Sequence, residues 1–506
     1  MDMLKRSSKI IFLLFFFMIV LSSGVAQTKN FVVINEYMSE NDLVKIAANI
    51  VPSPQQLRWQ RLEITAFFHF GINTFTDREW GEGNEDPKLF NPSALDARQW
   101  VKNCKEAGIK QVILTAKHHD GFCLWPSRYT EHSVKNSPWK NGKGDVVKEV
   151  SKACKEFGLG FGVYLSPWDR NNALYGTNDY NDYFVNQLTE LLTQYGQIDE
   201  VWFDGANGEG PNGKKQSYNF ERWYAVIRKL QPEAVIAICG PDVRWVGTET
   251  GHGREEEWSV VPVGEKNSKK ENTQTKMDEA PNGDMTENVL GSRSQLNEGN
   301  ALKWYPAETD VSIRPGWFYH KLEDAKVKTP EYLKEIYFHS VGRNGVLLLN
   351  IPPDKRGLIS EYDVNALKKW KLRLDSIFEK NLAKNAKFSK NITNAKQLLD
   401  GNDATYYKVA MNGKDNSIEF ELDKARTINV LLLQENINIG QRVEKFVLEY
   451  WSNGEWKKVV EGTTIGYKRL LEFPVINARK LRLIIAEARL QPALAEIGLF
   501  WDKNDK

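Results

Sequence analysis

Apolar runs and amphipathic stretches alternate along the chain from about residue 64 to residue 379. The apolar runs have the length of buried strands, whereas the stretches between them repeat apolar residues at helical spacing. This alternation is typical of a parallel sheet with helices packed outside it. We therefore predict an α/β fold, a closed TIM-like (β/α)8 barrel, with strands in residues 64–71, 110–121, 160–170, 199–205, 234–240, 242–251, 308–317 and 345–353.

The stretches between the predicted strands supply the outer helices. Their amphipathic periodicity, with glycine after several of them, predicts helices over residues 95–108, 145–158, 181–196 and 329–345. Residues 264–295 show little periodicity and are predicted to form a long surface loop.

After Lys380 the pattern changes to short strands of alternating apolar and polar residues, separated by turn residues. This spacing predicts an all-β sandwich. The stretch LLDGNDATYY, residues 398–407, resembles the opening of discoidin-like, galactose-binding-like modules, which often hold carbohydrate. The strands are predicted at residues 416–423, 428–435, 444–451, 455–462, 469–474 and 480–488.

The N-terminus has the features of a secretory signal. Basic residues precede an apolar run at residues 10–21, and small residues follow, up to Ala26. We expect cleavage after Ala26 and an exported protein, periplasmic or secreted, without a membrane span. The predicted organisation is a signal peptide at 1–26, an N-terminal leader at 27–52, the barrel at 53–380 and the sandwich, a carbohydrate-binding-like module, at 381–506.

The charge balance and the cysteines exclude two classes of protein. The formal net charge is +2, and without the predicted signal peptide 65 basic residues face 65 acidic ones. A nucleic-acid partner is therefore not expected, because such proteins carry a basic surface. The four cysteines show no CxxC spacing, and we expect buried free thiols rather than a disulfide framework.

One predicted strand ends on an acid: Asp204 follows the apolar residues 201–203 and precedes Gly205. Burying an unpaired charge is costly, so such a carboxylate either has partners or serves a function. In a barrel the carboxyl ends of the strands converge on one mouth, where active sites lie. The polar and aromatic residues at these ends are His69, Glu79, Trp80, Lys117, His118, His119, Asp120, Tyr164, Trp168, Asp204, Glu249, Arg314 and Trp317.

A metal centre is one interpretation of this set. His69, His118, His119 and Asp120 are all potential ligands. However, neighbouring residues of a strand point to opposite sides, so His118 and His119 should not share a metal. We therefore expect no catalytic metal and no other cofactor, while a structural calcium ion in the C-terminal module stays an open alternative.

Glycoside hydrolysis is the interpretation we favour. Retaining glycosidases use two carboxyl groups, one as a nucleophile and one as an acid and base. Asp204, at the end of a rigid strand, suits the nucleophile. Glu249, in a loop with glycines, suits the acid, since partial burial would help it to hold a proton. Glu255, Glu256 and Glu257 compete for the second role, although adjacent acids are more often a solvated face.

Five motifs together resemble the α-L-fucosidases of glycoside hydrolase family 29: FFHFGINTFTDREWG, TAKHHDGFCLWPS, YLSPWDR, VWFDGA and RWVGTETG. The resemblance spans residues 55–380. It implies that Asp204 is the nucleophile and Glu249 the acid/base, and that the substrate is a fucosylated oligosaccharide or glycoconjugate. It also implies that fucose is held by His69, Glu79, Trp80, His118, His119, Tyr164 and Trp317, to which the strand-end position adds Arg314.

The motif RWVGTETG, with Thr248 where that branch usually has asparagine, resembles the family branch that acts on α-1,3 and α-1,4 linkages. The expected function is thus a retaining exo-α-L-fucosidase that removes terminal fucose from Lewis-type branches. Two alternatives are left: another barrel exo-glycosidase, such as a galactosidase, and a non-catalytic glycan-binding protein.

Overall fold

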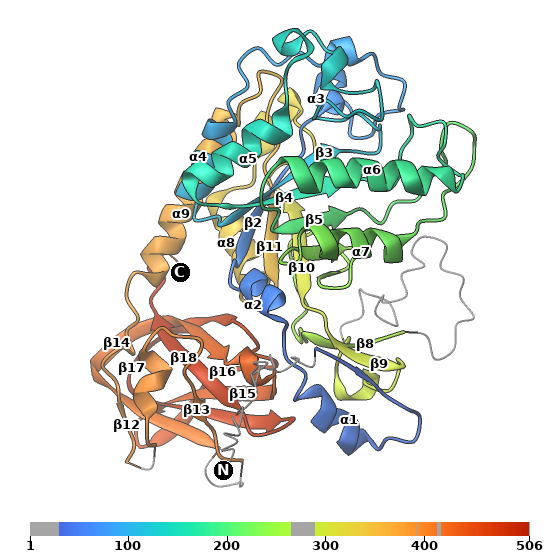
Figure 1. Cartoon of the computed structure of the whole chain (residues 1–506). Coiled ribbons are helices and arrows are strands. Elements are labelled where there is room, and N and C mark those ends of the chain that lie inside the picture. Colours follow the sequence, from blue (N-terminus) through green and yellow to red (C-terminus); the bar gives the residue numbers. More distant parts are fainter. Residues whose placement is uncertain (1–29, 265–288, 391, 412–415, 505–506) are drawn as a thin grey trace, which may run out of the picture.

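The protein consists of a (β/α) barrel followed by a β-sandwich, with a small third layer beside the barrel (Figure 1). The computed structural model describes residues 30–264, 289–390, 392–411 and 416–504. The predicted signal peptide and most of the predicted loop at 264–295 lie outside these residues.

Eight parallel strands form the barrel, in the order β6-β5-β4-β3-β2-β11-β10-β7. Within the described residues β6 and β7 end this order without pairing, so the barrel is nearly closed. Each predicted strand contains one observed strand, which confirms the barrel prediction. The strands are β2 (Ile64–Phe68), β3 (Gln111–Lys117), β4 (Gly160–Leu165), β5 (Glu200–Phe203), β6 (Val235–Ile238), β7 (Arg244–Trp245), β10 (Ala307–Ser312) and β11 (Val346–Asn350).

The helices around the barrel begin and end where local chemistry dictates. In α5, for example, Asp145 caps the first turn by accepting from the amide of Lys148, and Gly158 ends the helix with a φ of 72°. The helices of the barrel domain are α2 (Pro54–Gln60), α3 (Ile72–Thr76), α4 (Ala97–Glu106), α5 (Val146–Phe157), α6 (Asp179–Gln194), α7 (Phe220–Leu230), α8 (Pro330–His339) and α9 (Glu361–Phe378).

Two buried glutamates close the amino-terminal end of the barrel, next to α2. The Trp59 indole donates to Glu200 at 3.1 Å, and the Trp202 indole donates to Glu308 at 2.8 Å. Burial raises the pKa of Glu200 to about 8, and burial together with the neighbouring Glu200 raises that of Glu308. The pair therefore holds a proton at neutral pH, which avoids two adjacent buried charges.

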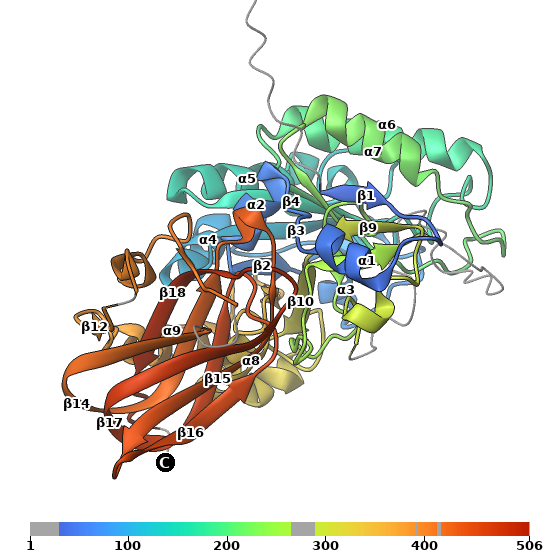
Figure 2. The same cartoon turned by 90° about the horizontal axis from the view of Figure 1, so that it is seen from below.

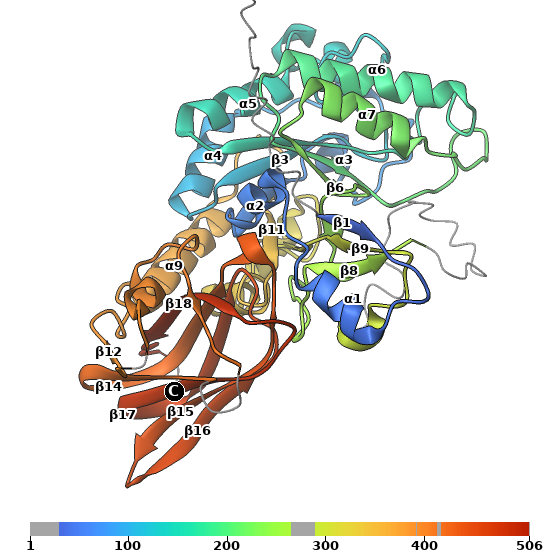
Figure 3. The same cartoon turned by 60° about the horizontal axis from the view of Figure 1, so that its bottom comes forward.

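A small antiparallel sheet lies beside the barrel together with α1 (Glu40–Ala47), as Figure 3 shows. Its order is β1-β9-β8. The segment predicted as a leader at 27–52 supplies α1 and an edge strand of this sheet. The other two strands flank the predicted loop at 264–295, in residues for which sequence analysis predicted no strand. The strands are β1 (Phe31–Val33), β8 (Val260–Val263) and β9 (Ala301–Trp304).

The C-terminal domain is the predicted antiparallel sandwich, in the order β13-β18-β14-β17-β15-β16, with β12 paired to β14 (Figure 2). Two long strands, β14 and β17, each include two of the predicted strands, because the chain continues through register shifts instead of turning. Sequence analysis missed β18 and the two short strands β12 and β13. The strands are β12 (Lys387–Phe388), β13 (Tyr407–Lys408), β14 (Ser417–Glu435), β15 (Val443–Ser452), β16 (Glu455–Gly462), β17 (Arg469–Ala488) and β18 (Ala493–Phe500).

The sandwich contacts the amino-terminal end of the barrel. Arg61 and Glu63, directly before β2, pair with Asp403 at 2.7 Å and with Lys468 at 2.6 Å. Because β2 runs from this end toward the mouth, these contacts lie at the end of the barrel opposite to the predicted active site.

Two further predictions concern the cysteines and the membrane. All four cysteines are buried and free, as expected. No helix among the described residues is both long and apolar enough to cross a bilayer.

Candidate active site

Asp204 lies directly after β5 at the mouth of the barrel, about a quarter exposed (26%). The amide of Ala206 donates to Oδ1 at 2.7 Å, and the Tyr164 hydroxyl donates to Oδ2 at 3.2 Å. Both bonds fix the direction of the carboxylate. The strand end thus presents a rigid, partnered carboxylate to the pocket.

Three histidines gather around this carboxylate. The ring centroids of His118 and His119 are 4.1 Å apart, and that of His69 is 5.8 Å from His118. His119 Nε2 lies 3.9 Å from Asp204 Oδ2. The expectation that His118 and His119 point to opposite sides is wrong, because β3 ends at Lys117 and both residues belong to the following turn.

The histidines are neutral at physiological pH. Burial lowers the pKa of His69 to about 3, and burial followed by the charge of its neighbours lowers that of His118. Burial also lowers the pKa of His119, against the opposing effect of Asp204. Neutral imidazoles offer both a donor and an acceptor, which suits the binding of hydroxyl groups.

Asn350, at the end of β11, fixes His69 on one side of the pocket. Its Oδ1 accepts from His69 Nδ1 at 2.9 Å, which leaves His69 Nε2 as an acceptor. Its Nδ2 donates to Ser312 Oγ at 2.9 Å and to the Trp317 carbonyl at 2.8 Å. One buried amide therefore sets the positions of two residues that sequence analysis assigned to the pocket.

Trp317 connects the histidines to Glu249. Its ring centroid lies 5.1 Å from that of His69, and its indole donates to Glu249 Oε2 at 3.2 Å. Glu79 holds the Trp317 backbone, accepting from its amide at 2.8 Å. The rings of Tyr164, His69 and Trp317 thus form a continuous series between the carboxylates of Asp204 and Glu249.

Two tryptophans form an aromatic wall beside His119. The ring of Trp168 lies 4.9 Å from that of His119, and Trp80, which is 55% exposed, lies 5.5 Å from both. Such a wall suits the apolar face of a sugar.

Comparison with known proteins agrees with this geometry. The profile of the family described as Alpha-L-fucosidase matches residues 55–371, and that of the F5/8 type C domain matches residues 383–496. The chain belongs to the α-L-fucosidase family, glycoside hydrolase family 29. It is thus a hydrolase, which decides against a non-catalytic protein, and a fucosylated glycan is the substrate class.

Several relatives resemble the enzyme over nearly its whole length. Alpha-L-fucosidase 1 of Arabidopsis thaliana is 45% identical, covering 90% of this chain and 88% of its own. A solved structure from Bacteroides ovatus is 50% identical, with a TM-score of 0.84, and covers 94% of this chain and 78% of its own. A Ruminococcus gnavus GH29 fucosidase in complex with fucose is 34% identical, with a TM-score of 0.76, covering 90% and 96%.

The acidic residues near Glu249 differ from the predictions. Glu249 itself is exposed rather than partly buried. Glu257 is fully buried and pairs with Arg244 and Arg254, so the acidic run is not a solvated face. Glu255 pairs with arginines of the barrel and of the sandwich, and Glu256 accepts from the Trp258 indole. These three acids therefore hold the domains and the loop together.

Arg314 does not line the pocket of the enzyme, which corrects its assignment as a substrate-binding residue. Its side chain is fully buried and pairs with Asp363 of α9 at 2.5 Å and with Asp324 at 2.9 Å. It also lies over the ring of Tyr319, at 4.5 Å. Arg314 thus connects the β10 loop to α9.

Asp310 is a site residue that sequence analysis missed. It lies inside β10, fully enclosed, and accepts from the Trp245 indole at 2.7 Å. Burial, together with the nearby charge of Glu249, raises its pKa well above the usual range. The signal that identified Asp204 was an acid directly after an apolar run, and it does not apply to Asp310, which lies inside the polar stretch AETDVS. Asn350, the last residue of its strand, could have been found by the strand-end rule.

Proposed function

We propose that the enzyme is a retaining exo-α-L-fucosidase in which Asp204 is the nucleophile and Glu249 the acid/base. The observation that carries this proposal is the series of rings that joins the two carboxylates, from Tyr164 through His69 to Trp317. A fucose bound with its anomeric carbon between Asp204 and Glu249 would have the two carboxyl groups on opposite sides of the glycosidic bond, as double displacement requires.

In the first step Asp204 Oδ attacks the anomeric carbon, while Glu249 donates its proton to the departing glycosidic oxygen. A covalent fucosyl-Asp204 ester forms, and the aglycone leaves as an alcohol. In the second step Glu249 takes a proton from water, the water oxygen attacks the same carbon, and Asp204 is released with configuration retained. The bonds from Ala206 and Tyr164 stabilise Asp204 as a leaving carboxylate.

The remaining pocket residues would bind fucose. His69, His118 and His119 are neutral and offer donors and acceptors to the hydroxyl groups. The 3.9 Å between His119 Nε2 and Asp204 Oδ2 is too long for a hydrogen bond and suits a sugar hydroxyl that contacts both. Trp80 and Trp168 offer an apolar wall to the 6-methyl group. The Ruminococcus gnavus relative was solved in complex with fucose, which supports fucose as the sugar bound here.

Azide distinguishes the two roles by the product it forms. We expect Asp204→Ala to lose turnover, and azide to convert an activated aryl α-fucoside directly into β-fucosyl azide. We expect Glu249→Ala to hydrolyse activated fucosides slowly, and azide to yield α-fucosyl azide through the retained ester. NMR of the products reads the anomer, and Glu256→Gln is the matched control for Glu249. Wild-type activity of Asp204→Ala would remove the nucleophile assignment.

The linkage preference rests on the loop that carries Glu249. Because Glu249 is exposed and Trp317 is half-buried beside the pocket, an aglycone bound there would contact both. The motif RWVGTETG supports a preference for α-1,3- and α-1,4-linked fucose on N-acetylglucosamine branches. Initial rates on α-1,2-, α-1,3-, α-1,4- and α-1,6-linked oligosaccharides test it, and a faster α-1,2 or α-1,6 reaction would contradict it.

Export and cofactors complete the proposal. We propose that residues 1–26 direct the enzyme to the periplasm or the medium, which fractionation of cells that express the full chain would test. The two-carboxylate chemistry needs no catalytic metal, so kcat should survive dialysis against EDTA. A structural calcium ion in the C-terminal module is tested by the melting temperature under EDTA. The test uses a variant lacking His339, because His339 is itself a potential metal ligand outside that module. A fall in melting temperature that calcium alone reverses would indicate the calcium ion.

A further inference from the structure

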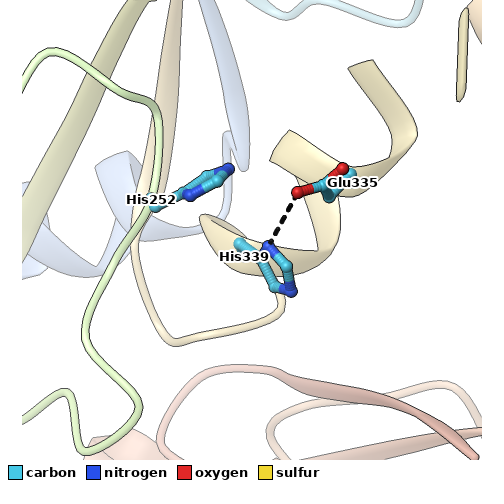
Figure 4. Close-up of side chains that lie close together, drawn as sticks. All are labelled: His252, Glu335 and His339. Atoms are coloured by element: carbon cyan, nitrogen blue, oxygen red, sulfur yellow. Dashed lines mark ion pairs between the residues drawn. The ribbon is translucent and has the colours of Figure 1, made fainter. Parts of the chain in front are cut away.

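His252, Glu335 and His339 form a cluster outside the pocket described above. Each offers a ligand atom, and the three atoms lie within 4.8 Å of one another. Figure 4 shows the imidazole of His252 on the loop, facing Glu335 and His339 on α8. We propose that these residues form a binding site for a divalent transition-metal ion, with Zn²⁺ as the best match.

The backbone already holds the three residues in place. Gly251 donates to the Asp310 carbonyl at 3.1 Å, and Gly253 donates to the His339 carbonyl at 2.7 Å. His252 is therefore fixed from both sides against β10 and α8. On α8, Glu335 and His339 are four residues apart, which places them on the same face of the helix.

The ligand atoms are available for a metal. His252 Nε2 is buried and, within the described part of the chain, has no hydrogen-bond partner. His339 Nδ1 lies 3.9 Å from Glu335 Oε1, too far for a hydrogen bond. Burial and the nearby Arg343 lower the pKa of His339 to about 4, and burial also lowers that of His252. Both imidazoles are thus neutral, the form that binds a metal.

The geometry and the chemistry of the ligands favour zinc. Tetrahedral Zn²⁺ places its ligand atoms about 3.3 Å apart, so separations of up to 4.8 Å must shorten by up to about 1.5 Å. The Glu335 side chain is 49% exposed and can make this movement. Two imidazoles and one carboxylate suit Zn²⁺ and its neighbours in the first transition row, whereas Ca²⁺ and Mg²⁺ prefer oxygen ligands. Water would complete the coordination.

The charges around the cluster set its affinity. Arg343 and Arg469 face His339 and oppose a bound cation, whereas Glu255 favours one. Arg343 is already paired with Glu255 and donates to the Gly253 carbonyl, which reduces its effect. We therefore expect a site weaker than one with four protein ligands. Since His252 lies three residues after Glu249, the metal would tie the segment that carries the proposed acid to α8.

Zinc binding to the full-length, untagged enzyme tests the site. After removal of metals with a chelating resin, equilibrium dialysis against micromolar Zn²⁺ should give one ion per chain and raise the melting temperature. Co²⁺ should give the visible absorption of a tetrahedral nitrogen and oxygen site. His339→Ala and Glu335→Gln should each weaken Zn²⁺ binding at least about tenfold and abolish the rise in melting temperature.

Glu331→Gln is the matched control, since Glu331 precedes Glu335 by one turn of α8 and is 71% exposed. It should bind Zn²⁺ like the wild type. Melting without metal shows whether each variant is folded, and His252→Ala gives an independent variant on the loop. The proposal is overturned if the wild type binds no Zn²⁺, or if His339→Ala, Glu335→Gln and His252→Ala all bind it as tightly as Glu331→Gln.

Discussion

The substitution Asn350→Asp separates positioning from direct contact with the sugar. Asn350 is wholly buried and makes four hydrogen bonds, two accepted from His69 and two donated by its amide nitrogen. Aspartate keeps the shape and the accepting oxygen but loses both donors. The substitution therefore removes the donors to Ser312 Oγ and to the Trp317 carbonyl, and it also places an acidic group beside His69 Nδ1.

The magnitude follows from what each partner can do in response. The Ser312 hydroxyl could donate to the new carboxylate only by releasing the Gly316 carbonyl, to which it now donates at 2.7 Å. The Trp317 carbonyl is an acceptor only, and it would face a carboxylate instead of its present donor. A buried group without a partner costs about 1–3 kcal/mol. If Trp317 and His69 are displaced and the activation free energy rises by about 2 kcal/mol of this cost, kcat/KM falls about 30-fold.

The assay compares kcat/KM on an aryl α-L-fucoside with the melting temperature. Asn429→Asp is the matched control, because Asn429 is also a buried asparagine and bonds Asp502 of the sandwich at 3.0 and 2.7 Å. Both variants should lose stability, but only Asn350→Asp should lose kcat/KM in the folded state. Equal kcat/KM for the two variants, below both melting temperatures, would refute the positioning role of Asn350.

Three further predictions follow from buried groups and from the indole of Trp317. The folded-state pKa of His69 is about 3, below the unfolded value of 6.5. Between these two pH values the unfolded chain therefore binds more protons than the folded one. Stability should therefore fall by about 2 kcal/mol from pH 7 to pH 5 through His69 alone, and urea titrations of the wild type and His69→Asn should show that difference. Arg314→Met leaves Asp363 buried without its partner, so the free energy of unfolding in urea should fall by about 3–5 kcal/mol. The kcat/KM of the folded variant should stay close to wild type. A large loss of kcat/KM would show that Arg314 does act in the pocket. Trp317→Phe keeps an aromatic ring but removes the hydrogen bond donated to Glu249, which is worth about 1 kcal/mol. The kcat/KM on branched trisaccharides should therefore fall about fivefold. An unchanged value would show that the bond is unimportant.

Several features of the enzyme could be predicted from local pattern alone. Six of the eight barrel strands, all except β7 and β10, are mostly apolar buried runs, and burial on both faces is a property that the chain displays locally. The rule that strand ends meet at one mouth then identified Asp204 and Tyr164, which the structure places in hydrogen-bond contact. The sequence was sufficient to predict the barrel because neighbours in the chain order of its strands are also neighbours in space, apart from the seam between β6 and β7.

Other features depended on contacts between distant parts of the chain. Arg314 occupies a strand end, yet its partner Asp363 comes from α9, and no local pattern shows that this ion pair removes the side chain from the pocket. In the same way, β1 and β9 pair across more than half of the barrel sequence. His252 and α8 come together only because the loop after Glu249 returns along the outside of the barrel. The sequence by itself determined which residues form the barrel strands and which carboxylates stand at their ends, because burial and periodicity are local. Only the tertiary structure decided which polar side chains lie at the mouth of the barrel and which are neutralised by a partner, because the energy of a buried charge depends on the groups that folding brings beside it.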